Sequence, residues 1–212
     1  MADWVTISAL ATAGGTLVLA AATFASVRSA NRAARVAELS LLAGLRPLLL
    51  PSRLQDVTQK IGFVDDHWVQ APGGGGVADV ANGTVYLAIS LRNVGSGIAV
   101  LHGWNFGAGR RSSSTAPDHA PLDKFHRLTR DLYVAPGDVG FWQGALRDPA
   151  TEEAQAARAA IEAREPLTIE LLYGDHEGGQ RIVTRFALMS REDGGWIAAA
   201  ARHWNIDRPD PR

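Results

Sequence analysis

The first long apolar segment of the chain runs from Trp4 to Val27 and contains no charged residue. At a rise of about 1.5 Å per residue, a helix of this length measures about 36 Å, which is enough to cross the hydrocarbon core of a bilayer. The residues before it carry no positive charge, so the basic n-region of a signal peptide is missing. A helix of a soluble protein usually carries a polar face, whereas this segment offers only Ser and Thr hydroxyls, which can bond back to the helix backbone. We therefore expect a transmembrane helix over residues 4–27.

The charges that flank this segment predict its orientation. Asp3 precedes it, and Arg28, Arg32 and Arg35 follow it directly. Positively charged residues stay on the cytoplasmic side of a membrane. We therefore expect a single-pass protein of the inner (plasma) membrane with its N-terminus outside and the rest of the chain in the cytoplasm. The three arginines should reach the lipid headgroups along their apolar stems, which makes membrane lipid one expected partner.

The transmembrane segment has two distinguishable faces. At 100° per residue Leu10, Leu17 and Phe24 fall on one side, and small residues gather on the other. Small residues let membrane helices approach closely, so this face predicts helix–helix association, either in a homo-oligomer or with a protein partner. An Ala-rich composition could produce the same stripe by accident, and the sequence leaves both interpretations open. The residues of the small face are Ser8, Thr12, Gly15, Ala22 and Ser26.

The helical pattern continues beyond the membrane segment. Arg28 to Ala43 contains neither Pro nor Gly, which predicts a juxtamembrane helix over residues 28–45 that prolongs the span. Gly44 offers a C-terminal stop, and the Arg46–Pro47 step prevents further continuation.

From residue 46 to 206 the pattern changes to short alternating segments typical of β-strands. The strongest is Thr84–Asn93, in which apolar and polar positions alternate, and Leu167–Tyr173 with Arg181–Met189 reads as a long hairpin. Turn residues recur about every ten positions, so we expect a mainly β fold, an antiparallel immunoglobulin-like β-sandwich of about eight strands. We expect one short helix after Asp148, the predicted N-cap, and a disordered tail over residues 207–212.

Other strands are expected at both ends of the domain and beside its turns. The tryptophans of the domain should fill the space between the two sheets. The expected strands are 47–51, 61–70, 98–106, 128–134, 139–146 and 196–204, and these tryptophans are Trp68, Trp104, Trp142, Trp196 and Trp204.

No stretch of the sequence carries a recognisable catalytic or cofactor motif. The glycine-rich loop Ala71–Gly76 lacks the Lys-Ser/Thr pair and the helix of a phosphate-binding loop. Gly95-x-Gly97 is an incomplete dinucleotide fingerprint and reads as a turn. The polar loop 107–124 and its flank contain residues that could ligate zinc, although their spacing matches no standard motif: Asp118, His119, Asp123 and His126. We therefore expect no metal site, no cofactor and no catalytic residue.

Charge and cysteine content narrow the function classes further. The net charge is −1, whereas nucleic-acid readers usually show a basic domain, so we expect no nucleic-acid partner. The chain has no cysteine, which excludes disulfides and thiolate chemistry.

The order of features resembles that of a group of uncharacterised bacterial (actinobacterial) single-pass membrane proteins with an N-terminal helix and a C-terminal β-sandwich. The resemblance implies a fold but no activity, and Ile98 replaces the group's usual proline. The matching pieces are Leu45-Arg46-Pro47, Leu91-Arg92-Asn93-Val94-Gly95-Ser96-Gly97-Ile98-Ala99, Ala135-Pro136-Gly137, and Tyr173-Gly174-Asp175 followed by Gly179 and Thr184.

The sequence thus predicts a membrane-anchored, non-enzymatic interaction or scaffold protein, an accessory subunit of a larger membrane assembly. The alternative is a β-sandwich that senses a small ligand and signals through the membrane helix. An enzyme using one of its histidines is the least favoured hypothesis, because HExxH and GxSxG are both absent.

Overall fold

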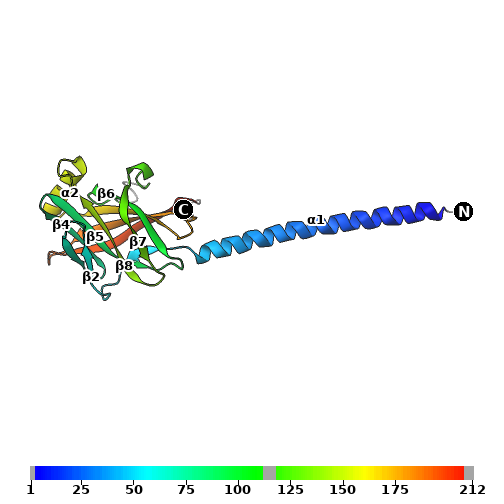
Figure 1. Cartoon of the computed structure of the whole chain (residues 1–212), viewed down its shortest axis with the longest axis horizontal. Coiled ribbons are helices and arrows are strands. Elements are labelled where there is room, and N and C mark those ends of the chain that lie inside the picture. The colour runs from blue at the N-terminus through cyan, green and yellow to red at the C-terminus, as the bar shows by residue number, and fades with distance from the viewer. Residues whose placement is uncertain (1–2, 112–117, 208–212) are drawn as a thin grey trace. The chain divides into compact units, whose positions relative to one another are not determined.

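The structure, a computed structural model, describes residues 3–111 and 118–207. The chain divides into two units, Met1–Ala43 and Gly44–Arg212. The first is a single helix, and the second is a mainly β domain (Figure 1).

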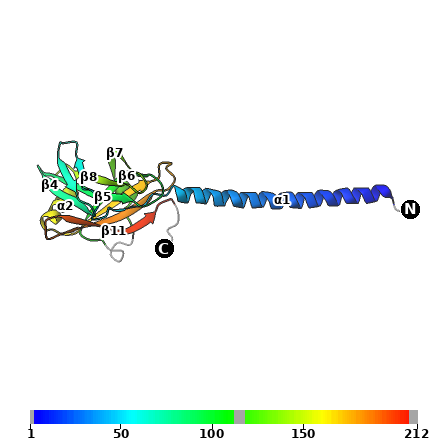
Figure 2. The same cartoon turned by 90° about the horizontal axis from the view of Figure 1, so that it is seen from below.

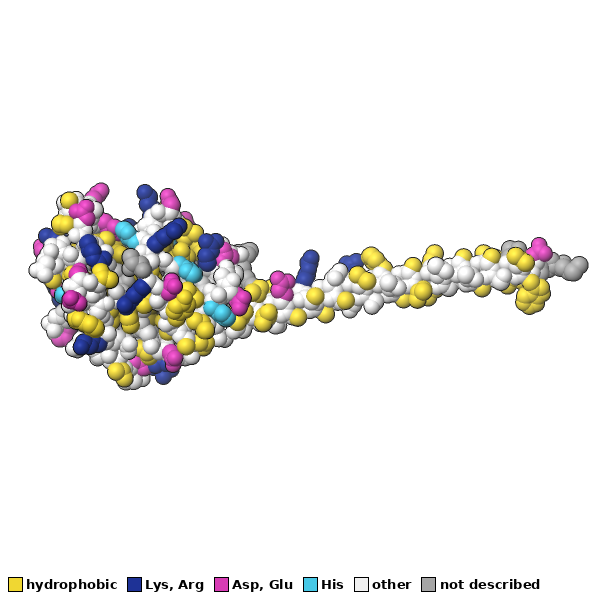
Figure 3. All heavy atoms as spheres, viewed as in Figure 1, with side chains coloured by type: hydrophobic (Ala, Val, Ile, Leu, Met, Phe, Trp, Pro, Cys, Tyr) yellow, Lys and Arg dark blue, Asp and Glu magenta, His cyan; other side chains and the backbone are white. Residues whose placement is uncertain are grey.

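Helix α1 runs from Trp4 to Gly44 without interruption, and its side chains are almost all exposed. It is the one helix among the described residues that is long and apolar enough to cross a membrane. Several hydroxyls bond back to their own helix; those of Thr12 and Thr23, for example, donate to the carbonyls of Ser8 and Leu19 at 2.9 and 2.8 Å. These polar groups therefore need no partner in lipid. The Arg and Glu side chains of α1 gather in its C-terminal half (Figure 3).

The β domain contains eleven strands, a short 3-10 helix and one α-helix within the described residues. Its elements are β1 (Leu49–Pro51), β2 (Gln59–Gly62), β3 (Trp68–Ala71), β4 (Gly75–Ala81), β5 (Thr84–Asn93), β6 (Ala99–Ala108), η1 (Leu122–Lys124), β7 (His126–Val134), β8 (Val139–Leu146), α2 (Glu152–Glu162), β9 (Leu167–Gly174), β10 (Ile182–Ser190) and β11 (Trp196–Asn205).

Nine of the strands form one curled antiparallel sheet (Figure 2). Its order is β1-β5-β4-β11-β10-β9-β6-β7, and β8 pairs with β5 off this path. The β4–β11 connection is narrow, because only Gly76 with Trp196 and Gly75 with Ile197 pair there. The curl encloses the main core, to which alternate residues of β5 (Leu87, Ile89) and β9 (Ile169, Leu171) contribute. This inward alternation is the pattern from which the strands were predicted.

The hairpin β2–β3 covers the opposite face of β5. Ile61, Phe63 and Val69 pack there with Tyr86 in a second, smaller core. The rings of Phe63 and Tyr86 meet edge to face at 4.8 Å between centroids. Strand β5 is therefore buried on both faces, which explains why all of its residues from Val85 to Leu91 are buried.

Helix α2 begins later than the sequence suggested. Its N-cap is Thr151, whose side chain accepts a hydrogen bond from the N–H of Ala154 at 3.2 Å, so the prediction of Asp148 was wrong. Asp148 instead closes the preceding turn by accepting a bond from the N–H of Ala150 at 2.9 Å. The helix buries Ala154, Ala157 and Ala160, whose small side chains allow a close approach to the sheet.

The prediction of a mainly β domain behind one long apolar helix is confirmed, but several details differ. The strand expected over residues 61–70 is the hairpin β2–β3, in which Asp66 adopts a positive φ of 58°. Gly75 and Gly76 belong to β4 rather than to a loop. A Cβ on Gly76 would lie 2.6 Å from the carbonyl oxygen of Ala88, so glycine here permits a close approach of strands.

Three of the five domain tryptophans, Trp104, Trp142 and Trp196, lie in the main core as expected. Trp68 is 59% exposed and packs under the ammonium group of Lys60. Strand β11 contains one extra residue, Ala201, opposite the Arg185–Phe186 step of β10. Beyond this bulge the side chains that pointed inward point outward and the reverse. Trp204 is therefore buried on the outer face of the sheet.

The long polar loop expected over residues 107–124 is only partly loop. Gly107 and Ala108 complete β6, and Leu122–Lys124 forms η1. Residues 112–117, and residues 208–212 of the tail expected to be disordered, lie outside the described residues.

Candidate functional site

The first candidate site is the place where the chain enters the β domain, and it is organised by Asn93. This side chain is fully buried. Its carbonyl oxygen accepts hydrogen bonds from the N–H groups of Leu48 and Gly95 at 3.1 and 3.0 Å. Its amide group donates to the carbonyls of Gly97 and Val134 at 2.7 and 2.9 Å. One amide thus joins the entering chain, the β5–β6 turn and the end of β7.

The turn after Asn93 packs against the backbone of the entering segment. A Cβ on Gly97 would overlap the carbonyl oxygen of Leu45, and one on Gly95 would overlap that of Arg46. The hydroxyl of Tyr173 reaches the same segment and accepts a bond from the N–H of Leu49 at 3.1 Å. Burial raises the pKa of Tyr173 to about 12, so the hydroxyl stays protonated. Three of the sequence pieces that carried the resemblance therefore meet around the domain entry, through Leu45–Pro47, Asn93–Gly97 and Tyr173.

The structure does not bring the candidate metal ligands together. The rings of His119 and Trp204 meet edge to face, with 5.7 Å between centroids. His126 pairs instead with Glu153 of α2, at 2.7 Å between Nε2 and Oε2. Among the described residues no group of three His, Asp or Glu side chains could hold a metal ion.

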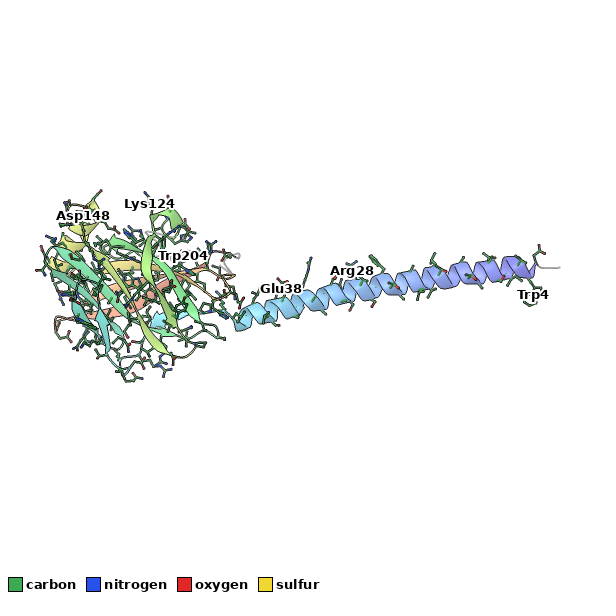
Figure 4. All side chains as sticks on the ribbon, in the orientation of Figure 1. Trp4, Arg28, Glu38, Lys124, Asp148 and Trp204 are labelled. Carbon is green, nitrogen blue, oxygen red and sulfur yellow. The ribbon has the colours of Figure 1, made fainter. Side chains whose placement is uncertain are left out.

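The predicted membrane residues all lie on α1 and are exposed. Those of the small face are Ser8, Thr12, Gly15, Ala22 and Ser26, and the arginines are Arg28, Arg32 and Arg35. The space around Gly15 is open, since a Cβ there would meet no atom within 4 Å. Arg28 and Glu38 mark the charged stretch of α1 in Figure 4.

The second candidate site surrounds β7, whose pairing with β6 is interrupted. His126 and Arg127 pair with Trp104 and Gly103, and the pairing resumes only at Leu132, opposite Leu101. Residues 128–131 of β7 have no partner on β6, and the extra residue of β6 is His102. Such bulges re-aim side chains and occur frequently beside functional sites.

A hollow of about 410 Å³ lies around His102. Arg127, Asp131 and Arg181 contribute to its wall. The imidazole rests over Gly174, where a Cβ would lie 3.2 Å from its Nε2. Partial burial, followed by the positive charge of Arg181, lowers the pKa of His102, so the ring is neutral at pH 7 although one side of it is exposed.

On the other side of β7, a cleft of about 270 Å³ separates it from β8, and we call it the β7–β8 cleft. Phe63 and Trp104 line its apolar part, and Arg127, Arg130 and Arg147 line its polar part. None of the described residues that line it is acidic. His126 borders this cleft and the His102 hollow, and also a third hollow of about 580 Å³ beside Lys124, whose position Figure 4 marks.

Sequence reasoning also missed a buried ion pair on the outer face of β9 and β10. The carboxylate of Glu170 lies 2.6 Å from Nη2 of Arg185, and both side chains are almost completely buried. Glu170 also accepts the N–H of Ala120, and Arg185 donates to the carbonyl of Asp118. The pair therefore holds the described end of the 107–124 loop against the sheet. Both residues occupy polar, outward-facing positions of strands with an alternating pattern, and such positions are usually exposed. Nothing in the sequence therefore indicated that these two side chains are buried.

Comparison of the chain with family models, curated proteins and solved structures finds no match. The candidate sites therefore stand on their own geometry: an entry held by Asn93 and a basic, incompletely paired surface around β7.

Proposed function

We propose that this chain is a membrane-anchored, non-enzymatic interaction protein, an accessory subunit of a larger assembly in the inner (plasma) membrane. The observation that carries the proposal is the exposure of α1, on which Leu10, Leu17 and Phe24 are each about two-thirds exposed or more. An isolated helix is only marginally stable in water, and apolar side chains on all its sides favour lipid or a partner helix. The β7 surface offers the domain a place to bind a protein.

The finer features belong to the same proposal. The N-terminus lies outside and the domain in the cytoplasm, because Arg28, Arg32 and Arg35 follow the apolar stretch. The small face of α1 associates with a second copy or a partner helix. We also propose that the domain is an immunoglobulin-like sandwich. The narrow β4–β11 connection supports this, because it divides the curled sheet into two arms around one core.

The test is purification of the full chain from native membranes in a gentle detergent, with mass spectrometry of the proteins that accompany it. A stoichiometric partner, lost from a Gly15→Ile variant but retained by Leu17→Ile on the opposite face, supports the accessory subunit. A monomer without a partner, or a chain released from membranes by high salt alone, contradicts it.

Orientation is tested separately, because the chain has no cysteine of its own. Single cysteines at Ala2 and at Arg191, which is exposed, are treated with a membrane-impermeant maleimide in spheroplasts. Labelling of Ala2→Cys alone is the expected result. Labelling of Arg191→Cys alone would reverse the orientation.

The hollow around His102 favours a second function, the sensing of a small anionic ligand. Its volume of about 410 Å³ falls in the range of small-molecule sites, and Arg127 supplies positive charge, whereas Arg181 is already paired with Asp207 and Asp131 lies in the same wall. A ligand that raises the melting temperature of the chain but not that of His102→Leu would support this function. Equal shifts in both proteins would exclude the hollow as the ligand's site.

A further inference from the structure

Strands β7 and β8 are joined by one turn but do not pair with each other. Within the described residues β7 pairs only with β6 and β8 pairs only with β5. Each strand therefore presents an edge with unpaired N–H and C=O groups, and the two edges border the same cleft.

The distance between the edges is set by side chains rather than by backbone pairing. Arg130 and Gln143 lie equally far from the turn, so in a regular hairpin they would pair through their backbones. Instead the guanidinium of Arg130 donates to the amide oxygen of Gln143 at 3.0 Å across the gap. Nearer the turn the strands do touch, since Val134 would contact a Cβ on Gly140 at 2.8 Å. The cleft therefore widens away from the turn.

The middle of β7 lacks ladder partners on both of its sides within the described residues. Residues 128–131 have no ladder partner on β6, and they have none on the side of β8 either. Backbone groups that are unpaired on both sides are a template for another strand.

The charge of the cleft defines what kind of strand fits. Arg127 is exposed, and its guanidinium has no ion pair or hydrogen bond with another described side chain or backbone group, although its backbone pairs with Gly103. Arg130 bonds to a neutral amide, and Arg147 lies 3.8 Å from its nearest carboxylate, that of Asp65. The hydroxyl of Tyr86 already donates to that carboxylate at 2.5 Å. The three guanidinium groups can therefore form stronger, charge-assisted bonds with incoming carboxylates.

We propose that the β7–β8 cleft binds an extended, acidic segment of a partner protein by strand addition. Backbone bonds to the open edges provide affinity, and alternate side chains provide specificity. Carboxylates on one face of the segment pair with Arg127, Arg130 and Arg147, while apolar side chains on the other contact Phe63 and Val64, which is 80% exposed. A nucleic acid would match the charge but cannot use the strand edges. This inference rests on the proposed function, because it names the partner's chemistry.

The first experiment measures binding of fluorescent nine-residue peptides to the full chain in nanodiscs of neutral lipid. An alternating Glu-Val peptide should bind, and the same peptide with N-methylated backbone amides should not, because methylation removes its hydrogen-bond donors. Equal binding of both peptides, or tighter binding of single-stranded DNA than of the peptide, overturns strand addition.

The second experiment uses matched charge reversals. Arg127→Glu should weaken peptide binding about tenfold or more, since a lost charge-assisted bond and a new repulsion each reduce affinity. Arg191→Glu changes the net charge equally in the β10–β11 turn and should leave binding unchanged. Equal losses of peptide affinity in both variants would contradict binding in the β7–β8 cleft. If a native partner still co-purifies with the Arg127→Glu, Arg130→Glu double variant, the accessory-subunit proposal stands and the cleft proposal fails.

Discussion

Helix α1 and the domain entry around Asn93 differ in the range of their hydrogen bonds. In α1 the hydrogen bonds of the described hydroxyls are local, and Ser8 and Thr12 donate theirs to carbonyls three and four residues earlier. At the entry the bonds are long-range, because Leu49 donates to the hydroxyl of Tyr173, which lies 124 positions further along the chain. A change in α1 should therefore act locally and through the membrane, whereas a change at the entry should unfold the domain.

The difference also explains where glycine is required. Gly14 and Gly15 in α1 have open space around them, while Gly95 and Gly97 lie directly against the backbone of residues 45–48. Gly14 and Gly15 make no contact that the helix needs, whereas Gly95 and Gly97 are required by the fold of the domain itself.

The largest effect is expected from Asn93→Ala. It leaves two N–H groups and two carbonyls without their partner, among them those of Leu48 and Val134, and should destabilise the domain by about 4 kcal/mol. The midpoint of thermal unfolding, followed by near-UV circular dichroism, should fall by about 8–16 °C. Asn93→Asp keeps the acceptor oxygen, so its unfolding midpoint should lie between those of the wild type and Asn93→Ala. An unchanged midpoint in Asn93→Ala would show that water replaces the amide at no cost.

A smaller effect is expected from the same substitution made in both regions. Gly97→Ala places its Cβ on the carbonyl of Leu45 and should cost about 3 kcal/mol. Gly15→Ala meets no atom and should stabilise its helix by about 1 kcal/mol, leaving the domain's midpoint unchanged. Equal shifts of the domain midpoint in the two variants would contradict the distinction between the regions.

Sequence reasoning worked where structure is determined locally. The continuity of α1 followed from the absence of Pro and Gly between Arg28 and Ala43, and strand β5 spans the same residues, Thr84–Asn93, as the alternating segment. Both signals depend only on neighbours in the sequence, which is why they survive in the fold.

Sequence reasoning failed where one extra residue in a strand, or a contact between residues far apart in the chain, determines the local structure. The bulge at Ala201 moved Trp204 to the outer face, and the bulge at His102 created a hollow that no motif announced. The role of Asn93 was invisible, because an Asn before a Gly-rich turn predicts only the turn. Its partner Val134 becomes a neighbour only after the sheet has curled.

The next prediction concerns pH and a part-buried ion pair of the β domain, Asp56 with Arg92. Arg92 donates to Asp56 at 2.6 and 3.2 Å and lowers the pKa of that carboxyl below its usual 3.8. Stability from this pair is therefore fully present above about pH 5 and is lost as the pH falls through the folded-state pKa. The midpoint difference between wild type and Asp56→Asn should be constant from pH 7 to 5 and shrink towards pH 3. Asp193→Asn, in an exposed pair, should change the midpoint little. A midpoint difference that grows towards pH 3 would contradict the predicted direction of the pH dependence.

The smallest effect is expected from Arg32→Gln, and it should concern lipid rather than folding. A basic residue close to an anionic bilayer surface contributes about 1 kcal/mol of attraction, which salt screens. Native mass spectrometry of chain released from mixed bilayers should therefore show fewer retained phosphatidylglycerol molecules in Arg32→Gln, with the difference vanishing at high salt. The domain's melting midpoint should not move, because Arg32 lies on α1. Arg191→Gln removes the same charge from an exposed turn of the β domain and should retain lipid as wild type does. Lipid loss in both variants would mean that net charge, rather than the position of the arginine on α1, governs headgroup binding.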